Sequence, residues 1–231
     1  AWSGNLQQVV RLLQDVQDTP SLKTIGDYAF TGCVKLIGLH TSFLTTVESV
    51  GKNAFYSCKS LVSTYAQFGP SLKSIGEKAF AYCYKLQTYT VPDSVSVIRN
   101  STFFYCSSLT SVVLSTSVTE IGYDAFKLCA KLGSVDTSAA TSLRIIGDNA
   151  FARCSNLQSI TLPNSLISIG EYAFYTCNSL RTVTIPHSVV SVGLGAYYSC
   201  FNLQRVKVGD NVTTLGAHVF DSCRNLQSVT L

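Results

Sequence analysis

The nine cysteines of this chain recur at intervals of 23 or 25 residues, and this period constrains the fold more than any other feature. They stand at Cys33, Cys58, Cys83, Cys106, Cys129, Cys154, Cys177, Cys200 and Cys223. Self-similarity at a period of roughly 20 to 50 residues is typical of chains that are built from stacked copies of one short unit. The period therefore predicts a repeat protein of nine units.

Each cysteine lies in a frame that reads I-G-x-x-A-F-x-x-C-x-x-L-x-x-I-x-I-P. In all nine copies a branched apolar residue stands eight positions before the cysteine, an aromatic residue three before it, and a leucine three after it. Beyond the leucine, apolar and polar residues alternate, which predicts a short strand with one buried face. Between the branched residue and the leucine, apolar residues recur every three or four positions, which predicts a turn or two of α- or 3₁₀-helix.

One unit cannot bury its own apolar side, so copies must stack. We therefore predict an α/β solenoid over residues 20–231, a right-handed superhelix with a parallel β-sheet on its concave side and short helical or 3₁₀ segments on its convex side. Residues 1–19 are predicted to form an amphipathic capping helix that ends before Pro20. The last unit stops at Leu231, so we expect an uncapped end that continues or is covered by another chain.

The frames resemble the BspA-like leucine-rich repeats, as in the copy that runs from Ile169-Gly170 through Phe174 and Cys177 to Leu180. The resemblance covers nearly the whole chain. It implies a leucine-rich-repeat solenoid that serves adhesion or protein–protein interaction on a curved scaffold, and it brings no catalytic residues. A shared fold of this kind does not identify a ligand.

The amino-acid composition excludes several classes of protein. Hydrophobic residues make up 46% of the chain and charged residues 13%, which suits a continuous core and not disorder. The net charge of +4 is spread along the chain, so we predict no nucleic-acid partner. No apolar run reaches the roughly 20 residues of a transmembrane helix. The first residues do not form a signal peptide and no methionine occurs, so we expect a processed or excised piece.

The cysteines and histidines do not predict a reactive centre. The cysteine count is odd and no C-x-x-C spacing occurs, so we interpret the nine thiols as one column of buried side chains, without disulfides or metal. His40, His187 and His218 fall in different repeats, so no Ser–His–Asp or Cys–His grouping is predicted. We therefore predict no enzyme activity, no metal and no cofactor.

The outward residues of the predicted strands form the first candidate binding surface. They stand two and four positions after each leucine, and eleven of the eighteen are serine or threonine. The predicted partner-binding residues on and beside these strands are Tyr65, Thr88, Thr90, Asp136, Thr161, Arg181, Thr184, Arg205 and Lys207. Tyr65 and Arg205 are the predicted anchors, because aromatic residues and arginine dominate binding hot spots. The alternative is that hydroxyl residues simply suit exposed strands.

Aromatic residues near the cysteines form a second candidate surface. The residues concerned are Tyr56, Tyr82, Tyr84, Phe104, Tyr105, Tyr175, Tyr198 and Phe201. The chain holds 24 tyrosines and phenylalanines, which is more than nine core positions require. Exposed tyrosines would suit an interface, and core filling is the alternative.

The leading functional hypothesis is a scaffold for adhesion or surface recognition that binds a protein, or alternatively a glycan, through the concave sheet. The alternative is a structural subunit of a larger assembly. A third hypothesis, ice binding, follows from threonine pairs such as Thr88 and Thr90, although a curved sheet matches a flat lattice poorly. The predicted location is secreted or cell-surface, with an intracellular or organellar assembly as the alternative. The sequence does not determine the oligomeric state.

Overall fold

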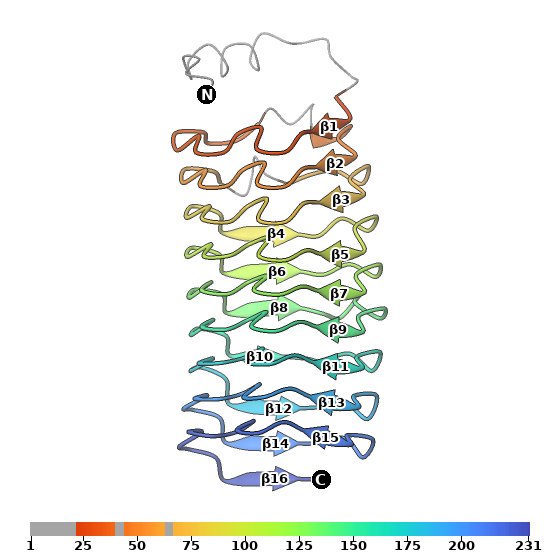
Figure 1. The fold of residues 1–231 in the computed structure, drawn as a ribbon, viewed down its shortest axis with the longest axis vertical. Helices are drawn as coiled ribbons and strands as arrows, with labels where there is room; N and C mark the ends of the chain where they lie inside the picture. The colour runs from red at the N-terminus through yellow and green to blue at the C-terminus, as the bar shows by residue number, and fades with distance from the viewer. Residues whose placement is uncertain (1–21, 40–43, 63–66) are drawn as a thin grey trace.

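The computed structural model describes residues 22–39, 44–62 and 67–231. Over these residues the chain winds into a column of nine coils, one for each repeat (Figure 1). We number the coils 1 to 9 by the cysteine that each contains, from Cys33 to Cys223. The predicted capping helix over 1–19 lies outside the described residues.

Two rows of short parallel strands run along the column (Figure 1). The first row consists of the branched residue of each frame and its predecessor. Its members are β1 (Thr24–Ile25), β2 (Ser49–Val50), β3 (Ser74–Ile75), β5 (Val97–Ile98), β7 (Glu120–Ile121), β9 (Ile145–Ile146), β11 (Ser168–Ile169), β13 (Ser191–Val192) and β15 (Thr214–Leu215). The second residue of each strand is buried from β1 to β13, so this row carries one wall of the core.

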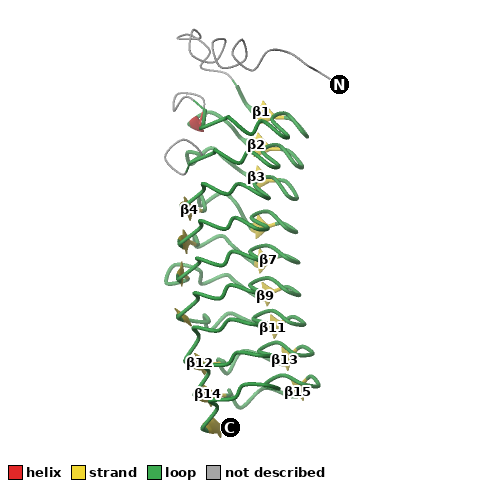
Figure 2. Cartoon of the chain, turned by 90° about the vertical axis from the view of Figure 1, so that its left-hand side faces the viewer, coloured by secondary structure: helices red, strands yellow, loops and turns green. Residues whose placement is uncertain are grey.

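The second row consists of the strands predicted after the frame leucine. Its members are β4 (Thr88–Thr90), β6 (Ser111–Val113), β8 (Ser134–Asp136), β10 (Ser159–Ile160), β12 (Thr182–Thr184), β14 (Arg205–Lys207) and β16 (Ser228–Thr230). We call its outer surface the strand face. The row divides into two sheets, β10-β8-β6-β4 and β12-β14-β16, because no ladder joins β10 to β12. The column bends little, so the strand face is nearly flat and not the concave surface that was predicted (Figure 2).

The predicted helical segments are wrong, because all nine frames are chains of turns (Figure 2). Two residues of every frame have a left-handed backbone, with φ between 52° and 72°. One stands three positions after the branched residue and the other immediately before the cysteine. A left-handed residue cannot continue a right-handed helix, so two of them within each frame exclude one. No helix among the described residues could cross a membrane.

Backbone amides of the turns donate alternately to their own coil and to the next one. In coil 2, the amide of Phe55 donates to the carbonyl of Ala79 in coil 3 at 2.8 Å, whereas the amide of Cys58 donates to the carbonyl of Phe55 at 3.0 Å. The alternation continues to coil 8, where the amide of Tyr197 donates to the carbonyl of Val219 at 2.9 Å. A coil alone would leave many amides unpaired, so each coil depends on its neighbours.

A stack of aromatic rings and a column of thiols fill the core. Ring centroids of successive coils lie 5.0 to 5.7 Å apart, with planes tilted by 19° or less. From coil 2 onward, each cysteine Sγ donates to the carbonyl of the aromatic residue in the preceding coil, at 3.1 to 3.3 Å. All nine cysteines are free and eight are buried, which confirms the predicted column. Cysteine suits this position because it is small, apolar and still a weak donor.

Candidate functional site

The predicted binding residues of the strand face that the structure describes are exposed. They lie on β4 (Thr88, Thr90), on β8 (Asp136), after β10 (Thr161), on and before β12 (Thr184, Arg181) and on β14 (Arg205, Lys207). Tyr65 lies outside the described residues. Between β4 and β12, the strands β6 and β8 carry serine, valine and aspartate at their outward positions. The described strands therefore lack the continuous threonine array that the ice-binding hypothesis requires. The role of these residues in binding stays a prediction.

The structure brings only some of these residues together. Thr161, Thr184 and Lys207 line one hollow of about 390 Å³ on the strand face, at the break between β10 and β12. Its other lining residues are Ser159, Ile160, Leu162, Asn164, Thr182, Ile185, Pro186 and His187. Thr88, Thr90 and Asp136 belong to earlier coils and lie outside this hollow.

In the earlier coils, some polar groups of the strand face already form hydrogen bonds with other residues of the chain. The side-chain amide of Gln67 pairs with the backbone of Thr90, donating from Nε2 to its carbonyl at 2.5 Å and accepting from its amide at 3.2 Å. A carboxylate oxygen of Asp136 accepts from the amide of Ser138 at 2.9 Å. The Ser138 hydroxyl and amide lower the pKa of Asp136, which keeps this carboxylate charged.

Five aromatic side chains contact one another on the opposite side of the coils, which we call the turn face. This N-terminal aromatic cluster consists of Tyr56, Tyr82, Tyr84, Phe104 and Tyr105, from coils 2 to 4. Its ring centroids lie 5.2 to 6.2 Å apart in edge-to-face arrangements, which aromatic pairs favour. Four of the five are half-buried and Tyr105 is exposed, so the cluster is a surface feature and not core filling.

Two members of the cluster have a strained backbone. Tyr82 and Tyr105 occupy the left-handed position before the cysteine, with φ of 62° and 55°. Coil 1 has Gly32 at this position, and coils 2, 8 and 9 have serine. A bulky residue in this conformation costs roughly 1–2 kcal/mol. Every coil has a left-handed residue at this position, so the strain belongs to the repeat and does not by itself mark the cluster.

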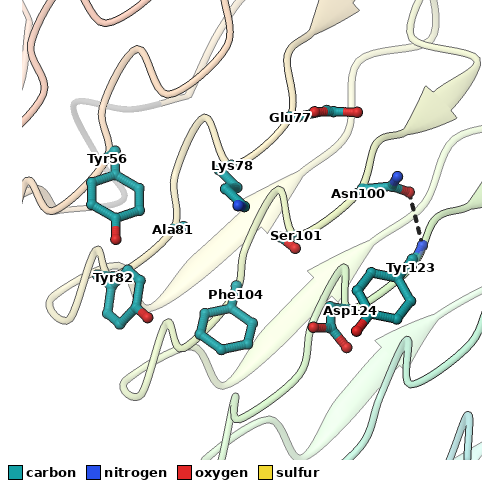
Figure 3. A pocket seen from close by; sticks show the side chains of 10 residues that line it. All are labelled: Tyr56, Glu77, Lys78, Ala81, Tyr82, Asn100, Ser101, Phe104, Tyr123 and Asp124. Atoms are coloured by element: carbon teal, nitrogen blue, oxygen red, sulfur yellow. Dashed lines mark hydrogen bonds between the residues drawn. The ribbon is translucent and has the colours of Figure 1, made fainter.

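A hollow of about 370 Å³ lies beside the cluster. Figure 3 shows Tyr56, Tyr82 and Phe104 along one side of it and Glu77, Asn100 and Tyr123 along the other. Lys78, Ala81 and Ser101 lie between the two rows, and Ala81 and Ser101 have small side chains (Figure 3).

The charges around this hollow are mostly balanced within the chain. Asp124 pairs with Lys127 at 3.0 Å, and Glu77 lies 3.5 Å from the ammonium group of Lys52. Burial, followed by the neighbouring tyrosines, raises the pKa of Tyr82, so its hydroxyl stays protonated at neutral pH. The surface therefore offers aromatic rings and neutral hydroxyls more than net charge.

A second, C-terminal aromatic cluster consists of Tyr172, Tyr175 and Tyr198 in coils 7 and 8. Their ring centroids lie 5.7 to 6.5 Å apart, and the Arg153 guanidinium lies 5.8 Å from the centroid of Tyr175. The prediction missed Tyr172, whose left-handed position carries a different residue in almost every coil. The predicted Phe201 belongs to neither cluster, and the Arg224 guanidinium lies 5.3 Å from its ring centroid.

In the part of the chain that the structure describes, the titratable groups do not assemble a nucleophile and a base. Burial raises the pKa of the Cys58 and Cys129 thiols to about 12, so they are not thiolates at neutral pH. At the turn face of coil 9, Asp221 accepts from the hydroxyl of Ser222 at 3.0 Å and lies 3.0 Å from His218 Nδ1. The carboxylate thus stands between the hydroxyl and the imidazole, so the imidazole cannot take the hydroxyl proton. Among the described residues, no group of three metal-ligating side chains occurs.

Comparisons with known proteins agree with the coil geometry. A family model described as the BspA type leucine rich repeat region, in six copies, matches residues 23–144 and 135–231. A comparison with curated proteins finds no significant match.

Several solved structures share the fold. A T. pallidum leucine-rich repeat protein is 34% identical, with a TM-score of 0.62, over 65% of this chain and 72% of that one. A leucine-rich repeat protein from Bacteroides ovatus is 28% identical, with a TM-score of 0.65, over 90% of this chain but only 64% of that protein's length. The pneumococcal vaccine antigen PcpA is 22% identical, with a TM-score of 0.56 over 90% of this chain and 54% of that one, which shows the fold alone.

Proposed function

We propose that this chain, which belongs to the BspA-type leucine-rich repeat family, is a scaffold that binds a protein partner through its turn face. One observation carries the proposal: the N-terminal aromatic cluster holds five rings in mutual contact beside a hollow of about 370 Å³. The proposal includes a role in adhesion and a secreted or cell-surface location.

The chemistry of this surface favours a protein interface. Tyrosine is enriched at interface centres, where it supplies a large contact area and a hydrogen-bonding hydroxyl. The rings of Tyr82, Tyr84 and Tyr105 contact one another, so they lose little side-chain freedom when a partner binds. The adjacent hollow gives a partner side chain a place to anchor.

The repeat itself provides a matched test of this surface. In the double variant Tyr82→Ser/Tyr105→Ser, serine replaces tyrosine at a position where coils 2, 8 and 9 have serine. The coils should therefore keep their structure. We expect partner affinity to fall at least tenfold, because loss of a hot-spot tyrosine typically costs about 2 kcal/mol.

The control is Leu128→Ser, which makes the same kind of change at the same position of coil 5, outside the cluster. Partners captured by the wild-type chain should also bind this control, and their affinities can be measured by surface plasmon resonance. Equal affinity of the wild type and the double tyrosine variant for every captured partner would refute the assignment of the turn face.

A further inference from the structure

The strand face has one interruption, between coils 6 and 7. β10 pairs with β8, and β12 pairs with β14, but no ladder connects β10 with β12. On the other side of β10, toward β8, the carbonyl of Thr161 accepts from the hydroxyl of Thr137 at 2.5 Å. The hollow of about 390 Å³ lies on this break, and its volume is within the roughly 300–1,000 Å³ typical of small-molecule sites.

Three cations without acidic partners stand on or next to β12 and β14, and one of them, Lys207, lines the hollow. Arg181, Arg205 and Lys207 are exposed, and none forms an ion pair with another described residue. Thr182 is paired in register with Arg205, and Thr184 with Lys207, so these side chains stand on neighbouring strands. Elsewhere in the described part of the chain, Lys23, Lys52, Lys73 and Lys127 pair with carboxylates and the other lysines and arginines do not, so this patch is distinguished by three cations on adjoining strands and not by their lack of a partner.

The acidic groups near the hollow do not neutralise this patch. Asp210 is exposed, and its carboxylate lies 3.2 Å from Nδ1 of His187. Asp136 lies on β8, the strand next to β10; it stays charged, accepts from the amide of Ser138, and forms no ion pair with the three cations. Coils 7 and 8 therefore offer positive charge to a ligand, and the fold of the described residues does not use that charge itself.

The polar groups that line the hollow indicate which class of anion the hollow binds. Hydroxyl groups of four residues and an amide surround it, from Ser159, Thr161, Thr182, Thr184 and Asn164. The apolar residues Ile160, Leu162 and Ile185 also line it but are only 8%, 6% and 1% exposed, so they offer a ligand little contact surface. Hydroxyl and amide groups match the hydroxyls of a sugar ring, and the cations match its acidic substituent.

We infer that the hollow between β10 and β12, with Arg181, Arg205 and Lys207 beside it, is a binding site for an acidic oligosaccharide that carries carboxylate or sulfate groups. Lys207 and Arg205 would bind the acidic group, and Thr161 and Thr184 the sugar hydroxyls. This site is separate from the aromatic surface of the turn face, so either assignment can fail without the other.

The test is calorimetric titration of the whole chain with three probes at about 150 mM salt: a heparin hexasaccharide, maltohexaose as a neutral sugar, and polyglutamate as an acidic peptide. We expect the heparin hexasaccharide to bind and the other two probes to bind at least tenfold more weakly. Absence of heparin binding overturns the inference. Polyglutamate binding as tight as heparin binding also overturns it, in favour of an acidic peptide.

Three double variants, one of them a control, separate the contribution of the charge from that of the hydroxyls. Arg205→Gln/Lys207→Gln should weaken heparin binding at least tenfold, whereas Lys35→Gln/Lys85→Gln removes the same charge from two exposed lysines that also form no ion pair, and should weaken it less than twofold. Thr161→Val/Thr184→Val keeps the charge and the side-chain shape, and it should weaken binding about threefold or more. Equal loss in both charge variants, or no loss in the threonine variant, would indicate nonspecific attraction and overturn the site. Thermal unfolding of each variant confirms that it is folded.

Discussion

The strand face and the turn face of each coil cover the same core, but they differ in backbone conformation. On the strand face, regular ladders leave alternate side chains exposed, and most of these are serine or threonine. On the turn face, the two left-handed positions of each coil hold residues as different as Gly32, Tyr82 and Leu128. The strand face therefore varies little except at its break, whereas the turn face varies from coil to coil and can form local sites.

The largest effect should come from the core that the two faces share. Burial raises the pKa of Cys58 and Cys129 to about 12, and raises it well above the ordinary value for Cys83, Cys106 and Cys154. A raised pKa stabilises the folded state below the ordinary thiol pKa of about 9, and this stability is lost as the pH rises from there toward 12. Each such thiol should lower the free energy of unfolding by about 1.4 kcal/mol per pH unit above pH 9.

Urea unfolding under reducing conditions between pH 8 and pH 10.5 measures this loss. The variant Cys129→Ala should show a shallower dependence on pH, because it has one fewer buried thiol. Stability that stays constant up to pH 10.5 would mean that the thiols are not held in an apolar core.

A smaller effect distinguishes the core from the turn face. Phe126 is fully buried in the middle of the ring stack, so Phe126→Ala should lower the free energy of unfolding by about 4 kcal/mol. Phe104 is half-buried in the N-terminal aromatic cluster, so Phe104→Ala should lower it by about 1 kcal/mol. Urea denaturation of both variants checks the difference. Similar losses would contradict the description of the cluster as a surface feature.

The smallest expected effect concerns the backbone, which is left-handed at Lys78 on the turn face and extended at Thr90 on the strand face. Lys78 is exposed on the turn face with φ of 54°, and Thr90 is exposed on the strand face. In Lys78→Gly the relief of strain offsets the flexibility of glycine, so the free energy of unfolding should change by less than about 0.5 kcal/mol. Thr90→Gly should lower it by about 1 kcal/mol, because glycine weakens a strand. Equal losses, measured by urea denaturation, would show that the left-handed backbone imposes no strain.

The sequence predicted most of the core because every core position recurs nine times. The frame leucines, the aromatic stack and the thiol column all follow from positions relative to the cysteines. The helical prediction was wrong because a spacing of three and four residues suits a series of tight turns as well as a helix. Only the observed φ values, such as 59° at Tyr28, distinguish the two.

The candidate sites were harder to predict, since they depend on side chains from several coils. Tyr82 and Tyr105 were predicted as aromatic surface residues, but their contact and the hollow beside them require coils 3 and 4 in position. Arg205 and Lys207 were predicted on the strand face, but nothing in the repeat pattern indicates the missing ladder between β10 and β12.

The amino-acid sequence alone determined the number of coils, their register and the residues that fill the core, because a 23- or 25-residue period allows one consistent stacking of its apolar positions. The tertiary structure alone decided the turn conformation and the hollows. The reason is physical: left-handed residues are stabilised by hydrogen bonds to the neighbouring coil, and a hollow forms only where side chains of adjacent coils leave space between them.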